Sequence, residues 1–149
     1  MKIVLDTNVL ISALLWQGPS HELLMAVEKR LFTLCMTPAL LEELKDVLKR
    51  PKFFSRLKKH NISCEDLFSG ITDIAALYPD IKIDSVVKDD PSDDKVLACA
   101  LASAAKYIIT GDPHILQLKV WSGVSILTPR QFLMLLSNRN RYQLRAKNS

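Results

Sequence analysis

The sequence predicts an α/β domain built around a mostly parallel sheet, and three observations lead to that class. Short apolar runs alternate with stretches of helical spacing along the whole chain. The run at residues 2–5 is continuously apolar rather than alternating, as in a strand buried on both faces. Several apolar runs end on a polar or acidic residue, which is typical of strands whose carboxyl ends form a ligand-binding edge.

The first half of the chain reads as strand, two helices, strand and helix. After the strand at 2–5, helical spacing runs from Asn8 to about Trp16, and again from His21 to Arg30, with a break at Gly18 and Pro19. The run FTLCM at 32–36 is the second strand. Thr37 and Pro38 then have the residue types of an N-cap and a first helical position, and this helix should end near Leu48.

In the second half we expect a helix from about Ser63 to Leu77, followed by a weak strand at 81–84. The segment DDPSDDK at 89–95 is a turn that leads into an Ala-rich helix from about Asp93 to Ala105. The segment YIITGD at 107–112 is a strand that ends in a Gly-Asp turn. The strand VSILT at 124–128 and a helix from Pro129 to about Asn138 complete the predicted order.

The chain of 149 residues, 48% of them hydrophobic, is long enough for one domain with a continuous core. We expect a single unit over residues 1–138, followed by a basic tail at 139–149. Cys35, Cys64 and Cys99 are odd in number and widely spaced, which argues against a disulfide framework and a zinc ribbon. No segment has the apolar length of a signal peptide or membrane span, so we expect a cytoplasmic protein.

Two acidic residues directly follow strands of the predicted sheet. Asp6 ends the strand at 2–5, and Asp112 ends the strand that begins at Tyr107. Both should project at the carboxyl edge of the sheet, where crossover loops and helix N-termini gather. Each residue also has a local explanation, because Asp6 can cap the next helix and Asp112 can belong to a turn.

Helical geometry separates the neighbouring acids of the helix that starts after Thr37. The apolar stripe of this helix is formed by Leu40, Leu41, Leu44, Val47 and Leu48. Glu43 lies about 100° from the centre of the stripe and Glu42 about 160° from it. Glu42 should therefore face water, while Glu43 stands where its carboxylate can reach a cleft beside the sheet.

The same geometry applies to the Ala-rich helix, with a buried stripe of Val96, Leu97, Ala100, Leu101 and Ala104. Asp93 lies about 20° from the centre of this stripe, Asp94 about 80° away, and Lys95 points outward. Asp93 is thus the acid on the inward line. A buried carboxylate must be paired, hydrogen-bonded or bound to a cation.

If these acids converge, their mutual repulsion requires compensation. Carboxylates about 4 to 5 Å apart repel by roughly 3 to 4 kcal/mol per pair at an effective dielectric constant near 20. A divalent cation removes this repulsion, and an all-oxygen set of ligands suits Mg²⁺ or Mn²⁺. The sequence therefore predicts a hard-metal site at the sheet edge.

Four blocks of the sequence resemble the PIN-domain ribonucleases, and within them the branch of toxin components of toxin–antitoxin systems. These blocks are IVLDTNVLISALL, TPALLEELKDVLKRPKF, DPSDDKVLACALASAAKYIITGD and ILTPRQFL, in the order and spacing of the family. The resemblance implies a three-layer α/β/α fold and an acidic quartet of Asp6, Glu43, Asp93 and Asp112, supported by Asn8 or Thr110.

The resemblance also implies Mg²⁺-dependent hydrolysis of RNA to 5′-phosphate and 3′-hydroxyl ends, a cognate antitoxin and a homodimer or higher assembly. Asp6 and Asp93 would be the main metal ligands, and Asp112 and Glu43 would bind a second ion or act through water. The block DPSDDK differs from the family's DPDDNK-like block at Ser92 and Asp94, which leaves Asp94 as the alternative to Asp93.

A basic segment follows the helix that carries Glu43. It contains six cations and no acid between Lys49 and His60, consistent with the net charge of +4 and pI near 9.0. These cations are Lys49, Arg50, Lys52, Arg56, Lys58 and Lys59. They can neutralise an RNA backbone, and Phe53 and Phe54 can offer rings on which bases stack. The alternative is a solvated helix whose phenylalanines pack inward. The basic tail offers the same choice between RNA contact and a disordered end.

Two other functional classes compete with the nuclease. One is an RNA-binding or regulatory module that has the same fold and little catalytic power. The other is a phospho-receiver domain, which also places acids at strand ends but needs an acidic pair beside the phosphorylated Asp. The run IVLDTN lacks that pair.

Overall fold

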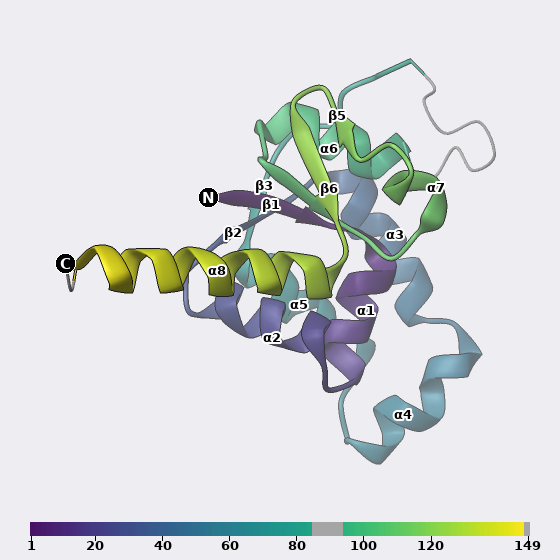
Figure 1. Cartoon of the computed structure of the whole chain (residues 1–149). Helices are drawn as coiled ribbons and strands as arrows, with labels where there is room; N and C mark the ends of the chain where they lie inside the picture. Colours follow the sequence, from purple (N-terminus) through teal and green to yellow (C-terminus); the bar gives the residue numbers. More distant parts are fainter. Residues whose placement is uncertain (85–93, 148–149) are drawn as a thin grey trace.

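A six-stranded sheet forms the centre of the protein (Figure 1). The computed structural model describes residues 1–84 and 94–147. The strand order is β3-β2-β1-β4-β6-β5, and every neighbouring pair is parallel except the last, β6 with β5. The strands are β1 (Lys2–Leu5), β2 (Thr33–Met36), β3 (Ala75–Leu77), β4 (Tyr107–Ile109), β5 (Val120–Trp121) and β6 (Val124–Leu127).

Helices cover both faces of the sheet. Helix α6 packs against β1, β2 and β4 on one face, while α2 and α8 pack together on the other (Figure 1). The helices of the described residues are α1 (Thr7–Leu15), α2 (Pro19–Glu28), α3 (Pro38–Leu48), α4 (Phe54–Lys59), α5 (Cys64–Ile74), α6 (Asp94–Ser103), α7 (Pro113–Leu116) and α8 (Pro129–Lys147), with a 3₁₀ turn η1 at Pro51–Phe53. The predicted α/β class with a mostly parallel sheet is confirmed.

The core is continuous from the strands into the covering helices. Ile3, Val4 and Leu5 of β1 are all buried, as expected for a strand covered on both faces. Phe132 anchors α8 to this core, because its fully buried ring packs edge-on against Phe32 and Tyr107 with centroid distances of 5.3 and 5.1 Å.

Local sequence signals placed α3 correctly. The Thr37 hydroxyl caps the helix by accepting a hydrogen bond from the Leu40 amide at 3.3 Å, and Pro38 is the first helical residue. The strands expected near 2–5, 32–36, 107 and 124–128 are also confirmed as β1, β2, β4 and β6.

The prediction was wrong around residue 80. The helix expected to reach Leu77 ends at Ile74, and residues 75–77 form β3 at the edge of the sheet, whereas residues 81–84 form no strand. A three-residue strand is too short to show a period of its own, so it was absorbed into the preceding helical pattern. The short elements α7 and β5 escaped prediction for the same reason.

The buried face of α6 also differs from the predicted stripe. Leu101 is 46% exposed and Ala104 lies beyond the helix with a positive φ of 56°, while Cys99 and Ser103 are buried. Ser103 can be buried because its hydroxyl donates to the Cys99 carbonyl at 2.7 Å. Asp93, the acid that the predicted stripe favoured over Asp94, lies outside the described residues.

Helix α8 was predicted to end near Asn138 but continues to Lys147. Its apolar spacing fades after residue 138, yet no Gly or Pro interrupts it, and the residues that follow include good helix formers such as Arg, Gln, Leu and Ala. The division of the chain at residue 138 therefore falls inside a helix. Within the described residues, no helix combines the length and apolar character needed to cross a membrane.

Candidate active site

Asp6 occupies the carboxyl end of β1 and the N-cap of α1. Its Oδ1 atom accepts hydrogen bonds from the Asn8 amide at 2.8 Å and the Val9 amide at 3.2 Å. Its Oδ2 atom accepts a hydrogen bond from the hydroxyl of Thr110, which follows β4. The side chain is only 7% exposed. The capping role considered for Asp6 is therefore real, and it leaves a carboxylate buried at the sheet edge.

Burial raises the pKa of Asp6 above the usual aspartate value. The hydrogen bonds from Thr110, Val9 and Asn8 oppose this rise, and the negative charge of Asp112 adds to it. Among the described residues, none of the groups that shift this pKa is a cation. Hydrogen bonds therefore stabilise the ionised form of Asp6, and within the described residues no positive charge adds to them.

Asp112 lies next to this carboxylate. Its backbone amide donates to the Thr110 hydroxyl oxygen at 3.0 Å, so Thr110 connects the two acids. Its Oδ1 atom accepts from the His114 amide at 2.8 Å and caps α7. Asp112 is thus both a turn residue, as the local interpretation holds, and a neighbour of Asp6.

Glu43 reaches the same region through a threonine. Its Oε2 atom accepts a hydrogen bond of 2.7 Å from the hydroxyl of Thr7, the residue after Asp6. Glu43 is half-buried and Glu42 is exposed, as the helical geometry predicted. The structure therefore brings Glu43 to the residue beside Asp6, and Glu42 stays in solvent.

Lys and Arg are absent from the sequence around Asp6 and Asp112, although Lys45 lies two residues from Glu43. Neither residue type occurs at positions 3–28, 31–44 or 107–118, which include Asp6, Glu43 and Asp112. Carboxylate and hydroxyl oxygens are donors that suit Mg²⁺ or Mn²⁺. Among the described residues, however, no three acidic, histidine or cysteine side chains gather closely enough to hold a metal, and this applies to Asp94 as well. Asp93 lies outside the described residues.

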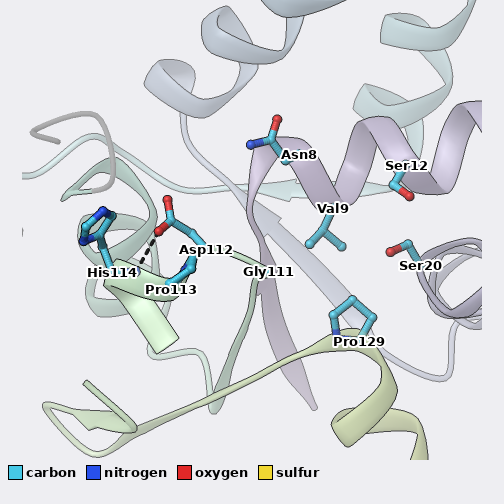
Figure 2. A pocket seen from close by; sticks show the side chains of 9 residues that line it. All are labelled: Asn8, Val9, Ser12, Ser20, Gly111, Asp112, Pro113, His114 and Pro129. Atoms are coloured by element: carbon cyan, nitrogen blue, oxygen red, sulfur yellow. Dashed lines mark hydrogen bonds between the residues drawn. The ribbon is translucent and has the colours of Figure 1, made fainter. Parts of the chain in front are cut away.

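A pocket of about 590 Å³ opens beside Asp112 (Figure 2). Asp112 and His114 line it at one end, and Ser12 and Ser20 line it at the other. Asn8, Val9, Gly111, Pro113 and Pro129 complete the lining. Sequence reasoning missed Ser12 and Ser20, although Ser12 follows Asn8 by four residues and therefore shares its side of α1.

The sequence of this chain matches a known protein family. Residues 2–114 match the family described as PIN domain, and this range includes Asp6, Glu43, Asp93 and Asp112. The chain belongs to the PIN domain family. Its fold is similar to the solved PIN domain of T. brucei RRP44, with 15% identity, a TM-score of 0.51, and coverage of 97% of this chain and 85% of the other. None of the curated proteins compared matches the chain.

PIN domains are generally nucleases, and they typically use divalent metals, Mg²⁺ or Mn²⁺. The oxygen donors of this PIN domain fit such an ion, since Asp6 is a buried carboxylate and, among the described residues, no cation contributes to the shift of its pKa. Family membership also decides against the phospho-receiver interpretation.

The side chains of the basic segment differ in their exposure and in their contacts with the rest of the protein. Lys49, Arg50, Lys52, Lys58 and Lys59 are exposed. Arg56 is half-buried instead, and its Nε atom donates to the Leu15 carbonyl at 2.7 Å. Phe53 is buried, as the solvated-helix interpretation expects, but Phe54 is 55% exposed. In α8, the Arg139 guanidinium donates to the Tyr107 hydroxyl at 3.2 Å.

Proposed function

We propose that this PIN domain is a ribonuclease that hydrolyses RNA phosphodiester bonds with a bound Mg²⁺ or Mn²⁺ ion. The observation that carries the proposal is the buried Asp6 carboxylate, which is held at the carboxyl edge of the sheet; in the part of the chain that the structure describes, no cation is among the groups that shift its pKa. A divalent ion would supply the missing positive charge.

In this proposal Asp6 and Asp93 are the main metal ligands, while Asp112 and Glu43 contribute to a second ion or act through water. A bound divalent ion lowers the pKa of a water ligand and stabilises charge on phosphoryl oxygens. The threonines orient the acids, because Thr110 fixes one oxygen of Asp6 and Thr7 fixes one oxygen of Glu43. Asn8 and Asp112 line the pocket beside these acids. In this proposal a nucleotide of the substrate lies in that pocket.

The test is cleavage of single-stranded RNA by the wild type with Mg²⁺ and with EDTA, and by Asp6→Asn and Asp93→Asn. We expect loss of activity with EDTA and a decrease of at least about 100-fold in each variant, which is the scale for removing a group that stabilises charge in the transition state. Asp94→Asn is the matched control for Asp93→Asn, and it should remain active.

Undiminished cleavage by Asp6→Asn would contradict the proposal. Circular dichroism of each variant separates loss of the site from loss of the fold. Because Asn caps helices about as well as Asp, Asp6→Asn should keep the start of α1.

An RNA-binding module with little catalytic power is the alternative. Its support is the basic segment, where Lys49, Lys52 and Lys59 are exposed. Salt-dependent RNA binding that is unchanged by Mg²⁺, without turnover under any condition, would support this alternative.

We further propose that the protein is the toxin of a toxin–antitoxin pair, acts as a homodimer or higher assembly, and has a cognate antitoxin. The support is the resemblance of its four sequence blocks to that branch of the family. Expression of the wild type should arrest growth of a bacterial host, and Asp6→Asn should not. Equal growth with both would contradict the toxin role.

A further inference from the structure

The C-terminal end of α1 carries a stacked pair of a tryptophan and an arginine. The Arg56 guanidinium carbon lies 5.0 Å from the centroid of the Trp16 ring, and Arg56 Nε donates to the Leu15 carbonyl at 2.7 Å. The Trp16 and Phe53 rings also pack in a T-shaped arrangement, with their centroids 6.3 Å apart. These contacts fix the indole in place while 43% of the residue stays exposed.

Arg56 keeps hydrogen-bonding capacity for a ligand. A guanidinium has five N–H donors, and within the described part of the chain only the Nε donor of Arg56 has a hydrogen-bond partner. The surrounding chain is strongly cationic, because residues 49–64 contain six Lys or Arg and no Asp or Glu. An exposed aromatic ring next to a guanidinium in such a segment matches the needs of a base and a phosphate.

A cavity of about 250 Å³ adjoins the pair. It is lined on the α1 side by Trp16 and Gln17, on the α2 side by His21, and on the α4 side by Arg56 and His60. The pocket at the active site is lined by Ser12 and Ser20. Ser20 and His21 are adjacent in α2, so the same turn of that helix contributes to both cavities.

Helix α1 connects the two cavities. Asn8, Ser12 and Trp16 recur at intervals of four residues, which places them along one side of the helix and its C-cap. Asp6 and Trp16 are the N-cap and C-cap of this helix, ten residues apart, so at about 1.5 Å per residue Trp16 lies roughly 15 Å along the axis from Asp6. Residues 7–21 contain no acid that would repel a phosphate backbone. Figure 1 shows α1 running from the sheet towards α4.

We propose that single-stranded RNA leaves the active site along α1 and that the Trp16–Arg56 pair binds a nucleotide remote from the scissile phosphate. A base stacks on the exposed part of Trp16, and the Nη groups of Arg56, with Lys58 and Lys59 nearby in sequence, bind the phosphates. Ser12 and Ser20 line the path between the two sites. This inference rests on the proposed ribonuclease function, and it adds a remote subsite to the substrate path.

Tryptophan fluorescence tests the contact directly. The chain has two tryptophans, so Trp121→Phe leaves Trp16 as the sole reporter. A single-stranded RNA oligonucleotide of mixed sequence is titrated into this variant in EDTA, which prevents metal-dependent turnover. We expect quenching that weakens as salt rises. Adding Arg56→Lys should weaken binding about 5- to 100-fold, the range for losing a base–aromatic stack or a guanidinium fork.

Arg30→Lys is the matched control, since it makes the same Arg-to-Lys change at an exposed position outside the basic segment. It should change the affinity little. Quenching that is absent, or equal weakening by Arg30→Lys and Arg56→Lys, would overturn the subsite. Quenching by an acidic peptide but not by RNA would overturn it too, because the occupant would then be a protein.

Kinetics separate this subsite from the nuclease activity itself. Trp16→Leu should raise KM for a long RNA, leave kcat unchanged, and have no effect on a trinucleotide too short to reach α4. An equal effect on both substrates would contradict the subsite. If the wild type cleaves no RNA but its Trp16 is still quenched, the proposed function fails while the RNA contact stands.

Discussion

The hydroxyl of Thr110 donates a hydrogen bond to the carboxylate of Asp6, and so joins the carboxyl ends of β4 and β1. The same hydroxyl oxygen accepts from the Asp112 amide at 3.0 Å. Thr110 is completely buried, so no solvent replaces it when it is removed. One side chain therefore positions two of the acids.

Thr110→Val should raise the pKa of Asp6 further, because the hydrogen bond that lowers it is lost. Metal affinity and RNA cleavage should fall about 10- to 100-fold, the usual range for a partner of a metal ligand. Thr110→Ser keeps the hydroxyl and is the control. Equal activity of the Val variant and the wild type would show that the hydrogen bond has no part in catalysis.

Glu43 and Glu42 form a matched pair for mutation. Glu43→Gln removes the charge that Thr7 orients, and we expect RNA cleavage to fall at least about 10-fold. Glu42→Gln changes an exposed neighbour on the same helix turn, so its activity should stay within a factor of about two of the wild type. Single-turnover rates at saturating Mg²⁺ measure both variants, and equal losses would remove Glu43 from the site.

The stability of the metal-free protein should depend on pH through Asp6. Because burial raises the pKa of Asp6 above 3.8, the folded chain binds this proton more tightly than the unfolded chain does. The contribution of Asp6 to the free energy of unfolding therefore falls as pH rises from 3.8 through the raised pKa.

Denaturant titrations in EDTA at a series of pH values measure this effect. As pH rises, the free energy of unfolding of the wild type should fall relative to that of Asp6→Asn. Mg²⁺ at neutral pH should restore the wild type, because the ion binds the ionised carboxylate. A difference that is independent of pH would show that Asp6 is not destabilised by burial.

Phe132 tests whether α8 belongs to the folded core. Phe132→Ala should lower the free energy of unfolding by about 3 to 5 kcal/mol, because the buried ring contacts Phe32 and Tyr107. Met134→Ala is the control on the same helix, since Met134 is exposed. Denaturant unfolding with both variants gives the comparison, and a loss below about 1 kcal/mol for Phe132→Ala would contradict the packing.

The parts of the fold that could be predicted have strong local signals. A continuously apolar run identified β1, and the Thr37–Pro38 pair located the start of α3. Helical spacing also separated Glu43 from Glu42, because α3 is long enough for its buried face to be well defined. The expectation that Asp6 and Asp112 meet rested on strand ends sharing one edge of a parallel sheet, and the Thr110 hydroxyl does hydrogen-bond to both residues.

The parts that could not be predicted depend on tertiary contacts. The edge strand β3 has its identity from pairing with β2, and nothing in residues 75–77 distinguishes it from the end of a helix. Ser103 replaces Leu101 on the buried face of α6 because a backbone carbonyl satisfies its hydroxyl. The bridge from Glu43 through Thr7 joins residues 36 positions apart, and no local pattern encodes such a contact.

A crystal structure of the protein soaked in Mn²⁺, with the ion located by its anomalous scattering, tests the proposed metal site most directly. We expect an ion bound by the carboxylates of Asp6 and Asp93, and no ion at that place in Asp6→Asn. An ion bound only away from Asp6 and Asp93 would contradict it.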